Sequence, residues 1–192
     1  MQVFKVLLIG CCFCVTKSML AQPQYVKITK PESAKGNVVF NMGTATNPKG
    51  SSIIVTPQSL LFNGKPVVPV MGEIHFSRIA ENEWEKELLK MKAGGITIIA
   101  TYVFWIHHEE IEAKYNWDGQ RNLTKFLEIC KQLDLPVVLR IGPWAHGECR
   151  NGGFPEWLVT SGVKLRNDNV EYLAIVKSWY QQIFNQAKCL LW

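Results

Sequence analysis

The stretch Ile96-Thr97-Ile98-Ile99-Ala100-Thr101-Tyr102-Val103-Phe104-Trp105 decides the fold of this 192-residue chain. It is rich in β-branched residues and too continuously apolar for a strand with one face in water. It therefore predicts a strand of a parallel sheet that is buried on both faces. Two further apolar runs, residues 67–71 and 136–141, lie on either side of it in the sequence. Polar side chains follow each run, and a parallel α/β barrel carries its site at such strand ends.

An amphipathic helix is predicted after each run, because apolar residues recur at helical spacing. The apolar positions are Trp84, Leu88 and Met91 in the first helix, Leu123, Phe126, Leu127 and Cys130 in the second, and Tyr172, Ile175, Val176, Trp179 and Ile183 in the third. Gly94-Gly95 ends the first helix, and the third begins near Asp168.

Three alternations of strand and helix, with strands that begin near residues 67, 97 and 136, predict an α/β fold. The spacing is that of a TIM (β/α)8 barrel, which needs about 250 residues for eight units. We therefore expect an incomplete TIM barrel of about the first three βα units. An open doubly wound sheet is the alternative, although residues 72–77 are not the Gly-rich phosphate loop that it usually carries.

Two segments are expected ahead of the barrel domain, which is assigned to residues 60–192. Residues 1–21 have a basic start, an apolar run at residues 6–15 and a small residue, Ala21, before a polar segment. This pattern predicts a cleavable signal peptide and a secreted or periplasmic protein, with a lipoprotein signal or an uncleaved anchor as alternatives. The run is too short to span a membrane. Residues 22–59 form a short irregular/β lead-in, with short strands at 38–40 and 53–55.

Composition and spacing exclude several classes of function. The net charge is +5, and the basic residues form no run or stripe, so no nucleic-acid partner is predicted. Cys130, Cys149 and Cys189 are isolated and form neither a disulfide scaffold nor a zinc site; Cys130 is expected to be a packed thiol. His107-His108-Glu109 looks rich in metal ligands, but adjacent strand residues point to opposite faces, so no metal is predicted.

Chemistry-bearing side chains gather after the three predicted strands, and we expect them to converge on one rim. They are Glu73, His75, Tyr102, Trp105, His107, His108, Glu109, Trp144, His146 and Glu148. Aromatic rings pack on the C–H face of a sugar and carboxylates accept bonds from its hydroxyls, so the rim predicts a sugar site. Structural roles stay open: Trp105 and Trp144 as caps of the core, His75 as a hydrogen-bonded residue, and Glu73 and Glu109 as buried partners of Arg78 or Arg140.

From about Leu60 onward the chain resembles glycoside hydrolase family 35, the β-galactosidases. The matching text, in order, is 62–66 (Phe-Asn-Gly-Lys-Pro), 72–78 (Gly-Glu-Ile-His-Phe-Ser-Arg), 91–95 (Met-Lys-Ala-Gly-Gly), 101–105 (Thr-Tyr-Val-Phe-Trp), 108–109 (His-Glu), 140–144 (Arg-Ile-Gly-Pro-Trp), Glu148 and 152–158 (Gly-Gly-Phe-Pro-Glu-Trp-Leu). So many motifs in a fixed order make the resemblance specific.

The resemblance implies a retaining β-galactosidase on a TIM barrel, with two glutamates, no cofactor and a β-galactoside glycan as substrate. It places the acid in a Glu-Asn-Glu-Tyr segment after the fourth strand and the nucleophile near the seventh. This chain contains neither segment, so we expect no catalytic residue in it and no activity without the C-terminal barrel half. The resemblance implies sugar binding by Tyr102 and Glu148, with Gly147, His146 and Trp144 in the same segment.

Two motifs depart from the family pattern. The usual Trp-Asn-Leu-His-Glu-Pro reads Trp-Ile-His-His-Glu-Glu at 105–110, and the usual Gly-Pro-Tyr-x-x-Ala-Glu-Trp reads Gly-Pro-Trp-Ala-His-Gly-Glu-Cys at 142–149. The wall of the expected pocket is therefore altered. A non-catalytic sugar-binding protein that uses Tyr102, Trp144 and Glu148 is one alternative function, and a truncated product that never folds is another.

Overall fold

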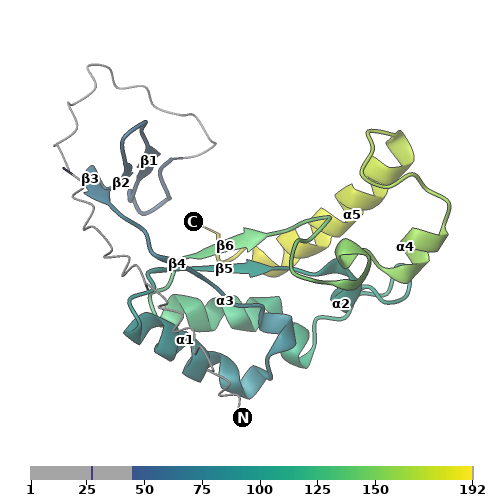
Figure 1. The fold of residues 1–192 in the computed structure, drawn as a ribbon, viewed down its shortest axis with the longest axis horizontal. Helices are drawn as coiled ribbons and strands as arrows, with labels where there is room; N and C mark the ends of the chain where they lie inside the picture. Colours follow the sequence, from purple (N-terminus) through teal and green to yellow (C-terminus); the bar gives the residue numbers. More distant parts are fainter. Residues whose placement is uncertain (1–26, 28–44, 192) are drawn as a thin grey trace, which may run out of the picture. The chain divides into compact units, whose positions relative to one another are not determined.

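The computed structural model describes Lys27 and residues 45–191, so the expected signal peptide and the strand expected at 38–40 lie outside the described residues. Two three-stranded sheets follow one another along the chain (Figure 1). The first is antiparallel and contains β1 (Ile53–Val55), β2 (Leu60–Phe62) and β3 (Lys65–Val67). The second is parallel and contains β4 (Met71–Glu73), β5 (Ile98–Tyr102) and β6 (Val137–Arg140).

The antiparallel sheet corrects the expected start of the first parallel strand. Phe62 pairs with Lys65 across a two-residue turn, in which Asn63 and Gly64 have φ values of 49° and 76°. Such a turn joins antiparallel strands. Val67 therefore ends β3 instead of opening the parallel sheet, and the first parallel strand begins at Met71. Residues 60–67 belong to the same small sheet as the lead-in strand β1.

The parallel sheet has the order β4-β5-β6, with β5 in the centre. Gly72 pairs with Ile99, and Ala100 pairs with Val138, so the three strands run side by side in one direction. Residues 99–105 are all buried, and β5 confirms a buried strand within the predicted run, although the strand ends at Tyr102 and Trp105 already begins α2. Within the described residues the sheet remains open and does not close into a barrel.

The predicted helices are present as α1 (Trp84–Ala93), α3 (Leu123–Gln132) and α5 (Val170–Ala187). Asn122 and Asn169 cap the last two, because each side chain accepts a hydrogen bond from the backbone N–H three residues later. Shorter helical segments lie in the connections: η1 (Phe76–Arg78), η2 (Glu81–Glu83), α2 (Trp105–His108), η3 (Gly119–Arg121), η4 (Arg150–Gly153) and α4 (Glu156–Thr160).

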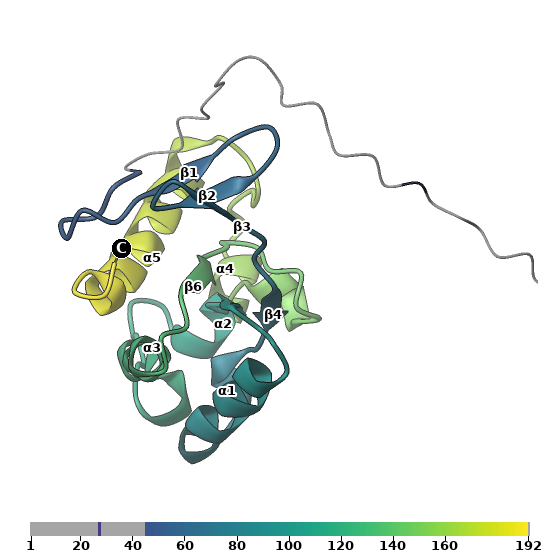
Figure 2. The ribbon, with the colours of Figure 1, turned by 90° about the vertical axis from the view of Figure 1, so that its left-hand side faces the viewer.

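The three long helices line one side of the parallel sheet (Figures 1 and 2), and the main core lies between the sheet and these helices. Trp84, Phe126 and Trp179, one from each helix, are fully buried in this core. Ile99 of β5 packs into it, whereas Tyr102 and Phe104 belong to a second, smaller cluster. Side chains of β5 thus alternate between two faces, and the second face carries the candidate site. In the described part of the chain, no helix is long and apolar enough to cross a membrane.

Candidate functional site

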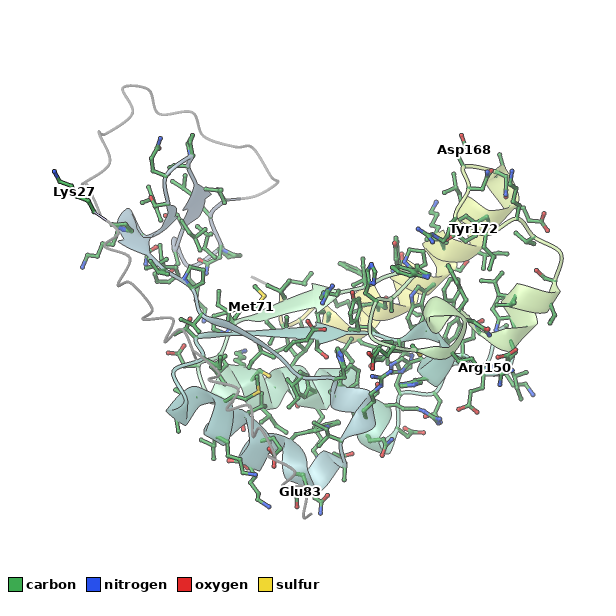
Figure 3. All side chains as sticks on the ribbon, viewed as in Figure 1. Lys27, Met71, Glu83, Arg150, Asp168 and Tyr172 are labelled. Carbon is green, nitrogen blue, oxygen red and sulfur yellow. The ribbon has the colours of Figure 1, made fainter. Side chains whose placement is uncertain are left out.

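The candidate site lies where the parallel strands end. Figure 3 shows Met71, the first residue of β4, and Arg150, which follows the last strand, at opposite ends of the sheet. Glu73, Tyr102 and Arg140 are the last residues of their strands. Because the strands are parallel and in register, these three side chains meet at one edge of the sheet.

An ion pair joins the outer strands across the central one. Arg140 Nη1 lies 2.7 Å from Glu73 Oε2, and its guanidinium carbon lies 3.9 Å from the centroid of the Tyr102 ring. His75 Nε2 is 3.5 Å from the other Glu73 oxygen. The pairing of Glu73 with Arg140 that was left open from the sequence is confirmed, but the pair is not buried as that alternative assumed. Both charged groups are partly in water, so the pair adds little stability, but it holds the guanidinium over the tyrosine ring.

Phe104 forms the floor of the site. Its ring is fully buried, and its centroid lies 5.1 Å from that of His75 and 4.4 Å from the guanidinium carbon of Arg78. Gly147 packs directly on this ring, because a Cβ there would come within 2.6 Å of Phe104 Cζ. Burial lowers the pKa of His75, an effect only partly offset by the charge of Glu73. The floor is thus aromatic, and its histidine favours the neutral form.

The loop after β6 presents the predicted acidic residue. Glu148 has a left-handed backbone with φ of 49°, and its carbonyl accepts a hydrogen bond of 3.4 Å from Arg78 Nη2. The side chains of His146 and Glu148 are exposed, whereas Tyr102 is buried. The structure therefore brings Tyr102, Gly147 and the backbone of Glu148 around one aromatic floor.

Trp144 lies on the same loop within a tight set of contacts. A Cβ on Gly152 would lie 2.0 Å from Trp144 Nε1, so only glycine fits beside the indole. The ring of His146 meets the indole edge-on with centroids 4.2 Å apart, and the guanidinium carbon of Arg166 lies 4.8 Å from the centroid of the indole. Trp144 is half-buried and packs against the core without being enclosed by it.

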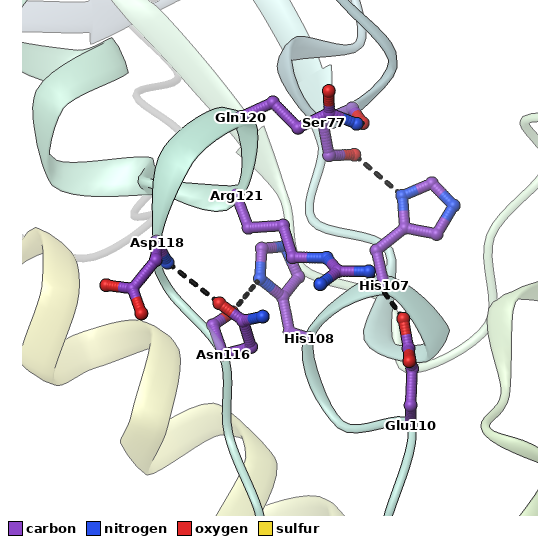
Figure 4. A network of polar contacts seen from close by, with 8 residues as sticks. All are labelled: Ser77, His107, His108, Glu110, Asn116, Asp118, Gln120 and Arg121. Carbon is purple, nitrogen blue, oxygen red and sulfur yellow. Dashed lines mark hydrogen bonds and ion pairs between the residues drawn. The ribbon is translucent and has the colours of Figure 1, made fainter.

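His107 and His108 lie on the short helix α2 and not on the extended strand that the sequence suggested. The two rings still diverge (Figure 4): His107 Nδ1 is 2.8 Å from Ser77 Oγ, whereas His108 Nδ1 is 3.1 Å from the carbonyl oxygen of Asn116. Burial lowers the pKa of both, that of His108 to about 3. Among the described residues, no group of three His, Cys, Asp or Glu side chains could hold a metal ion.

Trp105 and Glu109 are structural. The indole of Trp105 stacks on Trp179 with centroids 5.3 Å apart, and its Nε1 donates a 2.5 Å hydrogen bond to Glu109 Oε2. The other oxygen of Glu109 accepts from the backbone N–H of Ala113 at 2.8 Å. The core role left open for Trp105 is confirmed. The arginine pairing predicted as an alternative for Glu109 is wrong, because the N–H donors of Trp105 and Ala113 bind this buried carboxyl instead.

Two arginines acquire roles that strand-end reasoning did not give them. Arg78 was considered only as a partner for a glutamate, but it lies between Phe104 and the Glu148 carbonyl. Arg166 was not considered, because it follows no predicted strand. Its contact with Trp144 joins residues 22 positions apart, and no local pattern signals it.

Comparison with known sequences gives the family of this α/β chain. The profile of glycosyl hydrolases family 35 matches residues 59–192. "Beta-galactosidase 8" of Arabidopsis thaliana is 37% identical over 164 residues, which cover 85% of this chain and 19% of that protein. "Probable beta-galactosidase 2" of Dictyostelium discoideum is 40% identical over 126 residues, covering 65% and 17%. "Beta-galactosidase" of Homo sapiens is 36% identical over 135 residues, covering 70% and 20%.

The chain belongs to glycosyl hydrolases family 35. Membership implies the TIM-barrel catalytic domain of that family. The chain spans about a fifth of the length of the curated relatives that it matches.

Proposed function

We propose that residues 60–192 supply the first three βα units of a TIM-barrel catalytic domain, with β4, β5 and β6 as neighbouring barrel strands. The parallel order, the helices on one face and the family match from residue 59 support this assignment. In the same proposal, residues 22–59 are the lead-in and residues 1–21 a signal peptide that directs a secreted or periplasmic protein.

The proposed activity is hydrolysis of terminal non-reducing β-D-galactosyl residues in oligosaccharides or polysaccharides, with retention. Tyr102, Trp144, His146, Gly147 and Glu148 are the proposed sugar-binding residues. The observation that carries the proposal is the exposed carboxyl of Glu148, held on a left-handed backbone beside the buried floor of Tyr102 and Phe104. Such a wall offers an apolar face and a charged acceptor to one sugar ring.

Neither rim glutamate is proposed as a catalyst. Retaining hydrolysis needs two carboxyl groups about 5 Å apart, one as acid and one as nucleophile. Glu73 is engaged by Arg140 and His75, and Glu148 corresponds to a residue that accepts sugar hydroxyls in the family pattern. The proposed acid and nucleophile come from the fourth and seventh barrel strands, and no cofactor takes part. The 192-residue polypeptide alone is therefore expected to show no turnover.

The test measures hydrolysis of 4-nitrophenyl β-D-galactoside by the polypeptide encoded by the longest open reading frame that carries these residues. The corresponding α-galactoside and β-glucoside serve for comparison. We expect selective β-galactoside turnover, and a KM for Glu148→Gln that is raised at least tenfold. Glu112→Gln, a change at another exposed glutamate, is the matched control and leaves KM unchanged. Equal KM values for the two variants would contradict the role of Glu148. Saturable galactose binding without turnover would instead favour a non-catalytic sugar-binding protein.

A further inference from the structure

We propose that Arg166, held on the indole of Trp144, recognises an anionic group on the sugar that is attached to the galactosyl residue. The favoured substrates are then acidic β-galactosides, whose neighbouring sugar carries a carboxylate or a sulfate ester. The inference rests on the proposed function, and it assigns a substrate class to the outer part of the same site.

The first argument is how the guanidinium is held. Arg166 lies over the Trp144 ring at 4.8 Å, and Gly152 and His146 fix that ring from other directions. Cation–π contact of this kind orients an arginine while leaving its N–H donors in one plane. Arg166 is exposed, so the donors are accessible to a ligand.

The second argument is the distribution of charge among the arginines of the rim. Arg140 pairs with Glu73 at 2.7 Å, and Arg150 pairs with Glu156 at 2.9 Å. Within residues 45–191, Arg166 has no such carboxylate partner: neither Glu148 nor the nearby Asp168 forms an ion pair with it. Arg166 is therefore an oriented guanidinium whose charge is available for a ligand.

The third argument is the surface that Trp144 offers. Gly152 packs at the Nε1 edge of the indole, and Arg166 lies over the ring. A sugar that contacts Trp144 therefore lies next to the guanidinium. A planar guanidinium binds carboxylate or sulfate oxygens through paired hydrogen bonds, which are about twice as strong as neutral ones.

Position relative to the galactosyl wall completes the argument. Trp144 precedes Gly147 and Glu148 on the same loop, so Arg166 borders the proposed galactose-binding residues. Glu148 itself would repel an anion on the galactosyl ring. An anionic group is therefore better placed on the next sugar along the glycan.

The experiment compares kcat/KM for three β-galactosyl disaccharides whose second sugar is neutral, carries a carboxylate or carries a sulfate, using the longest open reading frame. We expect the wild type to prefer an acidic disaccharide and Arg166→Gln to reduce that preference about tenfold, which corresponds to ~1.4 kcal/mol. Arg150→Gln is the matched control, because that arginine is already paired with Glu156, and it keeps the preference within twofold. Salt at 0.5 M should reduce the preference in the wild type.

Preference for the carboxylate only, or for the sulfate only, supports the site and identifies its ligand. Hydrolysis of the neutral disaccharide with no acidic preference in the wild type overturns the inference and leaves the proposed function intact. The inference is also overturned if Arg166→Gln and Arg150→Gln show the same preference. Absence of any β-galactoside turnover would count against the proposed function instead.

Discussion

Replacing Gly152 by alanine tests whether Trp144 is locked in place by the backbone beneath it. Gly152 has φ of 63° and ψ of 26°, a left-handed conformation that alanine adopts at a cost of about 1 kcal/mol. The new methyl carbon would also lie 2.0 Å from Trp144 Nε1 and 2.3 Å from Cδ1. Two costs therefore act at this position, one from the backbone and one from packing.

The packing cost follows from the overlap. Carbon atoms in contact normally lie about 3.5–4.0 Å apart, so the methyl group and the indole would have to separate by roughly 1.5 Å. Overpacking of this kind costs about 1–3 kcal/mol. With the backbone cost, Gly152→Ala should destabilise the protein by roughly 2–4 kcal/mol. It should also displace the indole from Arg166, which packs on it.

Gly119→Ala is the matched control, because Gly119 has φ of 55° and no atom within 4 Å of the position of a Cβ. Gly119→Ala carries the backbone cost alone, so the difference in Tm between the two variants measures the packing cost of Gly152→Ala. At 2–4 °C per kcal/mol, that difference should be roughly 6 °C. Trp144→Ala introduced into Gly152→Ala should then recover part of the loss. Equal Tm values for Gly152→Ala and Gly119→Ala would refute the reasoning.

Three further outcomes are expected. Burial lowers the pKa of His108 to about 3, against about 6.5 when unfolded, so the unfolded chain binds the proton first and stability falls as the pH drops from 6.5 towards 3. Between pH 7 and pH 5, the free energy of unfolding measured by denaturation should fall less in His108→Asn than in the wild type. An equal fall in the two proteins would argue against this role of His108. Glu109→Ala should cost roughly 3 kcal/mol in urea unfolding, because the buried indole N–H of Trp105 and the part-buried N–H of Ala113 lose their acceptor. The exposed Glu112→Ala should change little, and similar costs for the two variants would contradict this. Burial raises the pKa of the Cys130 thiol to about 12, so iodoacetamide should label Cys189 in the native protein and Cys130 only after unfolding. Mass spectrometry reads the labelled residues, and labelling of both in the native protein would disprove the prediction.

The helices could be predicted from the sequence because their signal is local. Apolar residues three and four positions apart form one face whatever the rest of the chain does. Leu88, Phe126 and Trp179, each named from this spacing, are fully buried. The central strand could be predicted for a related reason, since a long β-branched apolar run has few other stable environments.

The start of the first parallel strand could not be read from hydrophobicity, because short apolar runs fit more than one element. Residues 67–71 are divided between the end of β3, an exposed connection and the start of β4, with Val68 89% exposed. The Asn63-Gly64 pair was the signal that could have corrected the expectation. This dipeptide between apolar residues predicts a two-residue hairpin, and the hairpin leaves the parallel strand to begin later.

The contacts that shape the candidate site were less accessible, because they join residues that are far apart in the chain. The fit of Gly147 against Phe104 and the position of Arg78 over the same ring depend on how the loop after β6 folds back onto β5. Strand-end reasoning correctly placed Glu73 and Tyr102 at one edge of the sheet, whereas Trp105, His108 and Glu109, expected at the same rim, are buried in the core. It gave no means of telling which glutamate would be engaged by a neighbour.

That distinction gives the two rim glutamates different chemistry. One oxygen of Glu73 accepts a hydrogen bond from Arg140, and the other lies 3.5 Å from His75 Nε2, so a ligand would have to compete with the Arg140 contact. Among the described residues, the carboxyl of Glu148 has no hydrogen-bond or ion-pair partner, while Arg78 holds its backbone through the carbonyl. A carboxyl with free acceptors on a held backbone can bind a sugar hydroxyl without displacing an existing contact, at the cost of ordering one side chain. This difference supports the proposal that Glu148 is the rim carboxyl that binds substrate, whereas Glu73 is held by its neighbour Arg140.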